Sequence, residues 1–115
     1  MLMAGGERGQ NARETRTLAS WAVVRDGDVC VCRARPRDLG AAAATELETH
    51  AVVGACRLLV LDLSQVRVMA PGVVAVLAGM VAGRAVRVLG AGPEVAATLA
   101  TAGLGALVVP GEATR

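Results

Sequence analysis

The stretch from Leu59 to Leu77, LVLDLSQVRVMAPGVVAVL, constrains the fold of this chain more than any other segment. It begins with an almost unbroken apolar run that ends at Asp62, and such runs are typical of a strand buried on both faces in the interior of a sheet. Pro71 and Gly72 interrupt the apolar pattern, and proline favours the first turn of a helix. The second apolar run therefore predicts a helix from Pro71 or Gly72 to about Gly83.

The segments on the N-terminal side predict a hairpin and a helix. Residues 21–34, WAVVRDGDVCVCRA, predict two strands around Asp26-Gly27. We interpret this pair as a type I′ turn, in which both central residues need positive φ. The next segment predicts a helix, for which Pro36 and Asp38 are start signals and Gly54 is a stop signal. Ala41 to Ala44 are the strongest helix formers, and Leu47 and Ala51 recur at helical spacing.

The C-terminal half continues with alternating strands and helices. Residues 57–64, 85–90 and 106–110 each predict a strand, and residues 93–103 predict a helix that ends at Gly103. The predicted order is ββαβαβαβ, a β-hairpin followed by βαβ units. We therefore predict an α/β fold with a mixed β-sheet and helices packed against it. Such sheets bind ligands and partners through loops at the carboxyl ends of their strands, so the loop 64–71 is the expected site.

Length and composition indicate one folded domain with polar ends. Residues 1–17 are polar and lack hydrophobic periodicity, so we predict a disordered N-terminal tail there. Residues 18–111 form the predicted domain, and residues 112–115 form a C-terminal tail. The chain has one Trp and no Phe or Tyr, so it lacks the aromatic surface on which nucleic-acid bases stack. We expect no nucleic-acid partner.

We expect neither secretion nor membrane insertion. The N-terminus has no apolar signal core, and the most apolar window, residues 68–83, is shorter than the about 20 residues that span a bilayer. The cysteines are Cys30, Cys32 and Cys56, and an odd number predicts free thiols in a reducing cytoplasm. Cys30 and Cys32 would point to the same face of a strand, where we expect them to be buried.

Residues that could perform chemistry are few and scattered. The single histidine, His50, has no second metal ligand at suitable spacing, so we expect neither a metal nor a cofactor. Ser20 and Ser64, the only serines, lie outside any nucleophile-elbow motif. Asp62 is the notable acid, and at a strand end it either accepts local backbone amides or contacts a partner. We therefore predict that the chain is not an enzyme, since only Asp62 and the cysteines would support that reading.

Residues 57–104, RLLVLDLSQVRVMAPGVVAVLAGMVAGRAVRVLGAGPEVAATLATAGL, resemble a STAS domain of the anti-sigma-factor antagonist, or anti-anti-sigma, family. The resemblance covers about Trp21 to Pro110, and its most specific parts are the strand end Asp62-Leu63-Ser64 and the spacing to the next loop. It implies a cytoplasmic bacterial signalling protein that binds an anti-sigma factor of the serine-kinase type. In the family that kinase phosphorylates a loop serine, and the added negative charge breaks the complex.

The sequence departs from the family at this switch. Val68 and Met69 match the hydrophobic pair before the loop, but the family's loop aspartate falls on Ala70. Its two serines fall on Pro71 and Gly72, so we predict no phosphorylation site. The resemblance then implies a protein-interaction module that loop-serine phosphorylation cannot switch.

The second helix supports binding rather than catalysis. Residues 73–82 contain no polar side chain, so apolar surface should remain exposed unless neighbouring helices and small Ala side chains account for it. The predicted partner-binding residues follow the buried strand and open this helix. They are Asp62, Ser64, Arg67, Met69, Ala70, Pro71, Gly72, Val73 and Val74.

Other functions stay open at this point. The chain could be a scaffold or a dimer-forming subunit of a larger signalling or transport assembly. Ala75, Gly79 and Gly83 are spaced so that another helix could approach closely, although they could equally serve an internal contact. The arginines at 33, 35 and 37 form either a weak basic patch or a solvated strand end. Binding of a small ligand or a nucleotide is a further alternative.

Overall fold

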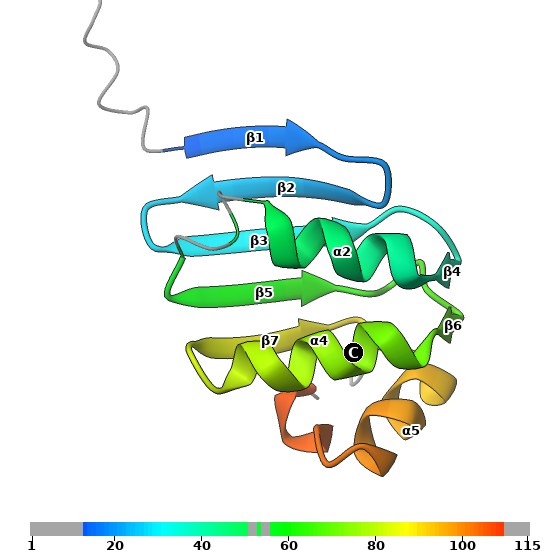
Figure 1. The fold of residues 1–115 in the computed structure, drawn as a ribbon. Helices are drawn as coiled ribbons and strands as arrows, with labels where there is room; N and C mark the ends of the chain where they lie inside the picture. The colour runs from blue at the N-terminus through cyan, green and yellow to red at the C-terminus, as the bar shows by residue number, and fades with distance from the viewer. Residues whose placement is uncertain (1–12, 51–52, 54–55, 110–115) are drawn as a thin grey trace, which may run out of the picture.

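A five-stranded mixed sheet in the order β1-β2-β3-β5-β7 organises the computed structural model, which describes residues 13–50, 53 and 56–109 (Figure 1). β1, β2 and β3 are antiparallel neighbours, whereas β3, β5 and β7 run parallel. The strands of this sheet are β1 (Arg13–Thr17), β2 (Trp21–Asp26), β3 (Val29–Ala34), β5 (Leu58–Asp62) and β7 (Ala85–Leu89). This arrangement confirms the predicted α/β class and the mixed sheet.

Two helices lie over one face of the sheet and a third lies beyond β7 (Figure 1). The helices are α2 (Ala41–Thr49), α4 (Pro71–Val81) and α5 (Pro93–Thr101). The prolines at the starts of α4 and α5 occupy the first turn, where no amide hydrogen bond is lost. After α5, Gly103 takes a φ of +82° and the amide of Leu104 bonds the carbonyl of Leu99 (2.8 Å), as predicted for a glycine that ends a helix.

The hydrophobic core lies between the sheet and α2 and α4. Alternate residues of the strands face it, because side chains along a strand point to opposite faces. Trp21 is fully buried and its indole Nε1 donates to the carbonyl of Ala43 in α2 (3.0 Å). Besides Trp21, the core residues that β2, β3, β5 and β7 contribute are Val23, Cys30, Cys32, Ala34, Leu59, Leu61, Val86 and Val88.

The opposite face of the sheet is only partly covered. Leu59 and Leu61 of β5 are fully buried, whereas Val60 is partly exposed and Val31, beside it on β3, is 37% exposed. The expectation of a strand buried on both faces is therefore wrong for β5, although its interior position in the sheet is confirmed. The helices cover one face only, so the uninterrupted apolar run leaves apolar side chains on the other.

The predicted N-terminal tail is wrong for residues 13–17, which form strand β1. Backbone hydrogen bonding to β2 holds this edge strand, and its charged and hydroxyl side chains stay in solvent, so no apolar pattern marks it in the sequence. The sheet therefore includes residues 13–17, which lie before the predicted domain start at residue 18. Residues 1–12 lie outside the described residues, as do 51–52, 54–55 and 110–115.

The predicted strand at 106–110 is also wrong. A 3₁₀ turn, η2 (Gly105–Leu107), takes up most of this segment. What is left is a single parallel bridge between Val88 and Val108, with the amide of Val109 bonded to the carbonyl of Val88 (2.8 Å). The turn leaves too few residues for a strand within the described part of the chain.

The β2–β3 hairpin has a different turn from the one predicted. Asp26 pairs with Val29, so the central residues are Gly27 and Asp28 rather than Asp26 and Gly27. Gly27 has a φ of +62°, and no described residue other than glycine has a positive φ. That sign pattern fits a type II′ turn, in which glycine holds the first central position.

The first helix, α2, begins at Ala41 after Gly40, so the start signals at Pro36 and Asp38 were misread: Asp38 and Leu39 form β4 and pair with β6 (Val68–Met69). The helix ends at Thr49 with His50 as its C-cap, and residues 51–52 and 54 of the predicted helix lie outside the described residues.

Candidate functional site

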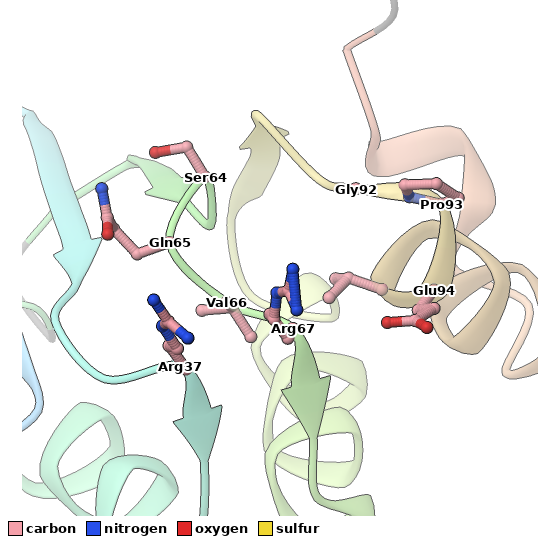
Figure 2. Close-up of a pocket in the computed structure, with 9 residues that line it drawn as sticks. Arg37, Ser64, Gln65, Val66, Arg67, Gly92, Pro93 and Glu94 are labelled. Carbon is pink, nitrogen blue, oxygen red and sulfur yellow. The ribbon is translucent and has the colours of Figure 1, made fainter.

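The loops that follow β3, β5 and β7 lie together because the carboxyl ends of parallel strands meet at one end of a sheet. Residues 35–37 follow β3, residues 63–67 follow β5 and residues 90–92 lead from β7 into α5. These loops surround a hollow of about 610 Å³ (Figure 2). Its lining residues are Arg37, Ser64, Gln65, Val66, Arg67, Gly92, Pro93, Glu94 and Val95.

Short-range contacts fix the loop after β5. The carboxylate of Asp62 accepts a hydrogen bond from the amide of Ser64 through Oδ1 (3.0 Å). This turn confirms the predicted structural role of Asp62 as an acceptor of local backbone amides. The amide of Leu63 bonds the carbonyl of Leu89 at the end of β7 (2.9 Å), which ties the two loops together.

Gly90 lets the β7 loop come close to the β5 loop. It has a φ of +71°, and a Cβ atom built on it would lie 2.8 Å from the Cβ of Ser64. Any larger residue would therefore be strained by its backbone conformation and would also displace Ser64. The glycine at this position serves close packing between two loops of the site.

A two-stranded parallel sheet, β4 (Asp38–Leu39) with β6 (Val68–Met69), places the remaining residues of the site. The amide of Arg67 bonds the carbonyl of Arg37 (2.7 Å), and the amide of Ala70 bonds the carbonyl of Leu39 (2.9 Å). Strands of two residues leave no pattern in the sequence, and this sheet was not predicted. The pairing brings Arg37, which precedes β4, and Arg67, which precedes β6, next to each other beside the hollow, as Figure 2 shows.

The hollow has a positive rim. Within the part of the chain that the structure describes, the guanidinium groups of Arg37 and Arg67 make no hydrogen bond or ion pair. Glu94, in the first turn of α5, is the one acidic residue among those that line the hollow. Two arginines against one carboxylate favour an acidic group as the occupant of this hollow.

The start of α4 adds an exposed, uncharged corner to the site. Ala70 is the N-cap and offers no side-chain hydrogen bond, and Pro71 and Gly72 are both exposed. A Cβ atom on Gly72 would meet no other atom within 4 Å. This position therefore has room for a side chain, although it holds none.

The nine predicted partner-binding residues divide by exposure. Ser64, Arg67, Pro71 and Gly72 are exposed, and Asp62, Ala70 and Val74 are half-buried. Met69 and Val73 were predicted as contacts but are 6% and 0% exposed. The structure corrects these two positions: they face the core and cannot touch a partner directly.

Val68, Arg37 and Glu94 were not predicted as site residues. Val68 is 58% exposed, next to the buried Met69, because adjacent strand residues point in opposite directions. That alternation could have identified Val68. Arg37 and Glu94 are distant from the β5 loop in sequence. The pairing of β4 with β6 brings Arg37 to the hollow, and the first turn of α5 brings Glu94 there. Arg33 lies on the open face of the sheet, and Arg35 donates to the carbonyl of Leu18 (2.8 Å), so the arginine cluster is split.

The outer side of α4 exposes mainly small residues, among them Ala75, Ala78 and Gly79, while its larger side chains Val74, Val76, Met80 and Val81 are half-buried against the core. Only Val73 and Leu77 of this helix are buried. Of the two expectations for this apolar helix, the structure therefore supports coverage by neighbouring elements and small side chains rather than a large exposed apolar surface.

A groove of about 370 Å³ runs between α4 and α2, with Ala75 and Gly79 on its α4 side. A Cβ atom on Gly79 would meet nothing within 4 Å, so the internal packing does not require glycine there.

The three cysteines lie together in the core as free thiols, as predicted. The Sγ atoms of Cys30 and Cys32 are 3.9 Å apart. The hydrogen bond with Cys30 and the burial of the side chain raise the pKa of the Cys32 thiol, and burial raises the pKa of Cys56. The same Cys32 hydrogen bond lowers the pKa of Cys30. Among the described residues, no group of His, Cys, Asp or Glu side chains is arranged to hold a metal ion.

Over residues 13–50, 53 and 56–109, none of the helices has the length and apolar character needed to cross a membrane.

Comparison with known proteins establishes the fold. No protein-family model and no curated protein match the sequence. The solved structure described as the anti-sigma factor antagonist SpoIIAA in its unphosphorylated form superposes with a TM-score of 0.60, at 17% identity, over 84% of this chain and 85% of that chain. The Bacillus cell fate determinant SpoIIAA in the phosphorylated form gives 0.54, at 18% identity, over 84% and 88%. The chain therefore has the STAS fold of SpoIIAA, as the sequence resemblance implied.

Proposed function

We propose that this STAS-fold chain is a protein-interaction module of the anti-anti-sigma type, which binds an anti-sigma factor of the serine-kinase type. It acts in the bacterial cytoplasm in transcription regulation and performs no catalysis itself. The shared fold with the anti-sigma factor antagonist SpoIIAA supports the class of protein. The geometry of the loops supports where the partner binds.

One observation carries this proposal: the loops present exposed groups for which the described part of the chain provides no hydrogen-bond or ion-pair partner. We call Arg37, Arg67, Val68, Pro71 and Gly72 the loop surface. It joins two guanidinium groups to an exposed valine and to the start of α4. Arginine is enriched at protein interfaces, and the centre of an interface is more apolar than its rim. A partner can therefore use both the two arginines and the exposed valine of the loop surface.

The partner's matching surface carries acidic groups. Arg37 and Arg67 flank the hollow of about 610 Å³, so a carboxylate side chain of the partner can enter between them. Val68 then packs against an apolar part of the partner beside this contact. A partner surface with an acidic residue next to an apolar one meets both requirements.

Binding is constitutive in this proposal. The positions that match the family's loop serines hold Pro71 and Gly72, so the partner kinase has no hydroxyl there to phosphorylate. The open space at Gly72 means that the fold does not exclude a serine from this position. The protein would therefore act as an antagonist that its partner cannot turn off.

The test begins with purification of the tagged protein from its own cells and identification of what is bound to it in stoichiometric amount. A serine-kinase-type ATPase, once identified, is purified and titrated with the protein by calorimetry. Arg67→Glu and Val68→Asp should each weaken binding at least tenfold. Arg33→Glu, which changes a basic residue on the open sheet face, is the matched control and should bind as the wild type does.

The outcome that rejects the proposed site is equally defined. If Arg67→Glu and Val68→Asp bind the kinase with wild-type affinity, the loop surface is not the interface. If the stoichiometric partner is no ATPase of this kind, the anti-sigma assignment fails as well.

A second candidate function rests on the outer side of α4, where the exposed residues are mainly small. In that reading the chain is a scaffold subunit of a larger signalling or transport assembly, and another helix docks in the groove between α2 and α4. Gly79→Arg would fill this groove without disturbing the core, because the position is open. Recovery of transporter or other STAS subunits with the wild type, and their loss with Gly79→Arg, would favour this function over the first.

A further inference from the structure

Among the residues that the structure describes, no strand pairs with the outer edge of β1. Within the five-stranded sheet β1 pairs with β2 alone, and it lies at the end opposite β7 (Figure 1). Its five residues read Arg-Glu-Thr-Arg-Thr, and four of them are exposed. Free edges expose unpaired amides and carbonyls, which are a template for another strand.

The hairpin register shows which backbone groups face outward. The amide of Leu18 bonds the carbonyl of Trp21 (2.7 Å), and Thr17 pairs with Ala22. Hydrogen-bonded and non-bonded pairs alternate along an antiparallel ladder. Residues 14 and 16 therefore turn their amides and carbonyls toward β2, whereas those of residues 13, 15 and 17 point away from the sheet.

Any second strand must match these outward groups. An antiparallel copy of β1 meets this condition when odd-numbered residues face odd-numbered residues. In the register centred on Thr15, Thr15 lies opposite Thr15 of the other copy and Arg13 lies opposite Thr17. This register forms about six backbone hydrogen bonds, two for each of the bonded pairs.

Charge selects this register over its neighbours. Centred on Thr15, Glu14 of one copy lies directly opposite Arg16 of the other, and the symmetric pair repeats the contact. Shifted by two residues in one direction, Glu14 faces Glu14; shifted in the other, Arg16 faces Arg16. Opposite charges across a strand pair stabilise it and like charges destabilise it. Both side chains are accessible, with exposures of 41% for Glu14 and 54% for Arg16.

We propose that two copies of this chain associate through β1, antiparallel and about a two-fold axis at Thr15, so that their sheets become continuous. The occupant is a second copy because the strand is complementary to itself in both hydrogen bonding and charge, as an isologous interface requires. The interface leaves the loop surface free in both copies, since that surface lies at the carboxyl ends of β3, β5 and β7. This inference is independent of the proposed function.

Sedimentation velocity of the full chain over a wide concentration range tests the proposal. The wild type should shift from monomer to dimer as concentration rises. Thr15→Pro removes an outward amide without touching the bonds to β2, and it should be a monomer throughout. Gly79→Arg, on α4, is the control and should dimerise as the wild type does.

Charge variants test the register itself. Glu14→Arg places two arginines opposite each other in both cross-strand pairs, and Arg16→Glu places two glutamates there, so each variant alone should be monomeric. A mixture of the two should form a heterodimer, because both cross-strand pairs then join an arginine to a glutamate. Within one chain Glu14 also pairs with Arg16 (3.5 Å) and with Arg25 (3.6 Å); Glu14→Arg removes both pairs and Arg16→Glu removes the first. Such exposed ion pairs add little stability, and circular dichroism will verify that each variant is folded.

The results that overturn the proposal are distinct. A wild type that stays monomeric at every concentration rejects it. A dimer that persists in both charge variants, or one that Gly79→Arg abolishes, shows that another surface is used. Failure of the mixed charge variants to associate while the wild type dimerises rejects the register centred on Thr15.

Discussion

Two single residues have a large effect on the structure, Trp21 in the core and Gly90 at the site. Trp21 links the sheet to α2 through the bond from its Nε1 to the carbonyl of Ala43, and Gly90 allows two loops to touch. Trp21 supplies both a large apolar ring and a hydrogen-bond donor, and Gly90 adopts a positive φ with no Cβ atom to meet Ser64. The consequences of changing them can be stated separately for stability and for the site.

Trp21→Phe should lower the free energy of unfolding by about 1–3 kcal/mol, because it removes a buried hydrogen bond and leaves a cavity. Urea denaturation followed by circular dichroism measures the change. Val31→Ala, which alters a side chain that is 37% exposed, is the control and should cost less. Equal losses in the two variants would show that Trp21 does not organise the core.

Gly90→Ala should destabilise the protein by about 1–3 kcal/mol, since a positive φ strains Ala and the new Cβ meets Ser64 at 2.8 Å. It should also weaken partner binding by displacing the loop after β5. Gly92→Ala is the matched control, with a φ of −73° and no atom within 4 Å of the new Cβ. If both variants unfold at the same denaturant concentration, the close approach of the two loops is not important for stability.

The cysteines should be protected from thiol reagents in the folded protein. All three are buried, and the raised pKa values of Cys32 and Cys56 keep these thiols protonated and unreactive near neutral pH. Reaction with Ellman's reagent should therefore be slow in buffer and rapid in urea. Fast reaction of Cys30 without denaturant would show that the strand opens in the native state.

At the scale of elements, α4 is the segment whose sequence is most unusual and whose start forms part of the site. Its first turn lacks both an N-cap side chain and an acidic residue. A negative charge there is favourable to the helix dipole. The same charge would, however, repel the acidic groups that we propose on the partner's surface.

Gly72→Asp should therefore separate stability from binding. We expect it to leave the protein as stable as the wild type or more stable by about 0.3–1 kcal/mol, and to weaken binding to the kinase-type partner at least tenfold. Thermal denaturation and calorimetric titration give the two values. Gly72→Ala, which fills the same open space without charge, should bind normally. Undiminished binding by Gly72→Asp would exclude the start of α4 from the interface.

The elements that could be predicted from sequence were those with strong local signals. The apolar runs predicted β5 and α4, Pro93 and Gly103 marked the ends of α5, and the valines on either side of a glycine turn predicted the hairpin. β1 could not be predicted because it contains no apolar residue. β4 and β6 have two residues each, and only their pairing in the folded chain makes them strands.

The site shows the same division. Arg67, Pro71 and Gly72 were predicted from their place after a buried strand, and they are exposed. Arg37 and Glu94 were missed because tertiary pairing brings them to the hollow. Met69 and Val73 were wrongly included because a resemblance to a family loop gives position along the chain, whereas burial depends on which way each side chain points.

At the scale of the whole molecule, the fold separates its surfaces. The core lies under α2 and α4, the loop surface lies at one end of the sheet, and β1 forms one edge of the sheet (Figure 1). The two proposed interactions, with a kinase-type partner at the loop surface and with a second copy at the β1 edge, use separate surfaces and are compatible with each other. The central claim is that the first of these interactions is not controlled by phosphorylation.

The most direct measurement is the affinity for the purified kinase-type partner before and after incubation with labelled ATP and Mg²⁺. We expect no incorporation of phosphate into this chain and the same affinity in both conditions, because the positions that match the family's serines hold Pro71 and Gly72. Phosphate incorporated into the chain together with loss of binding would contradict it, and Ser64, the exposed serine of the β5 loop, would then be the first position to examine.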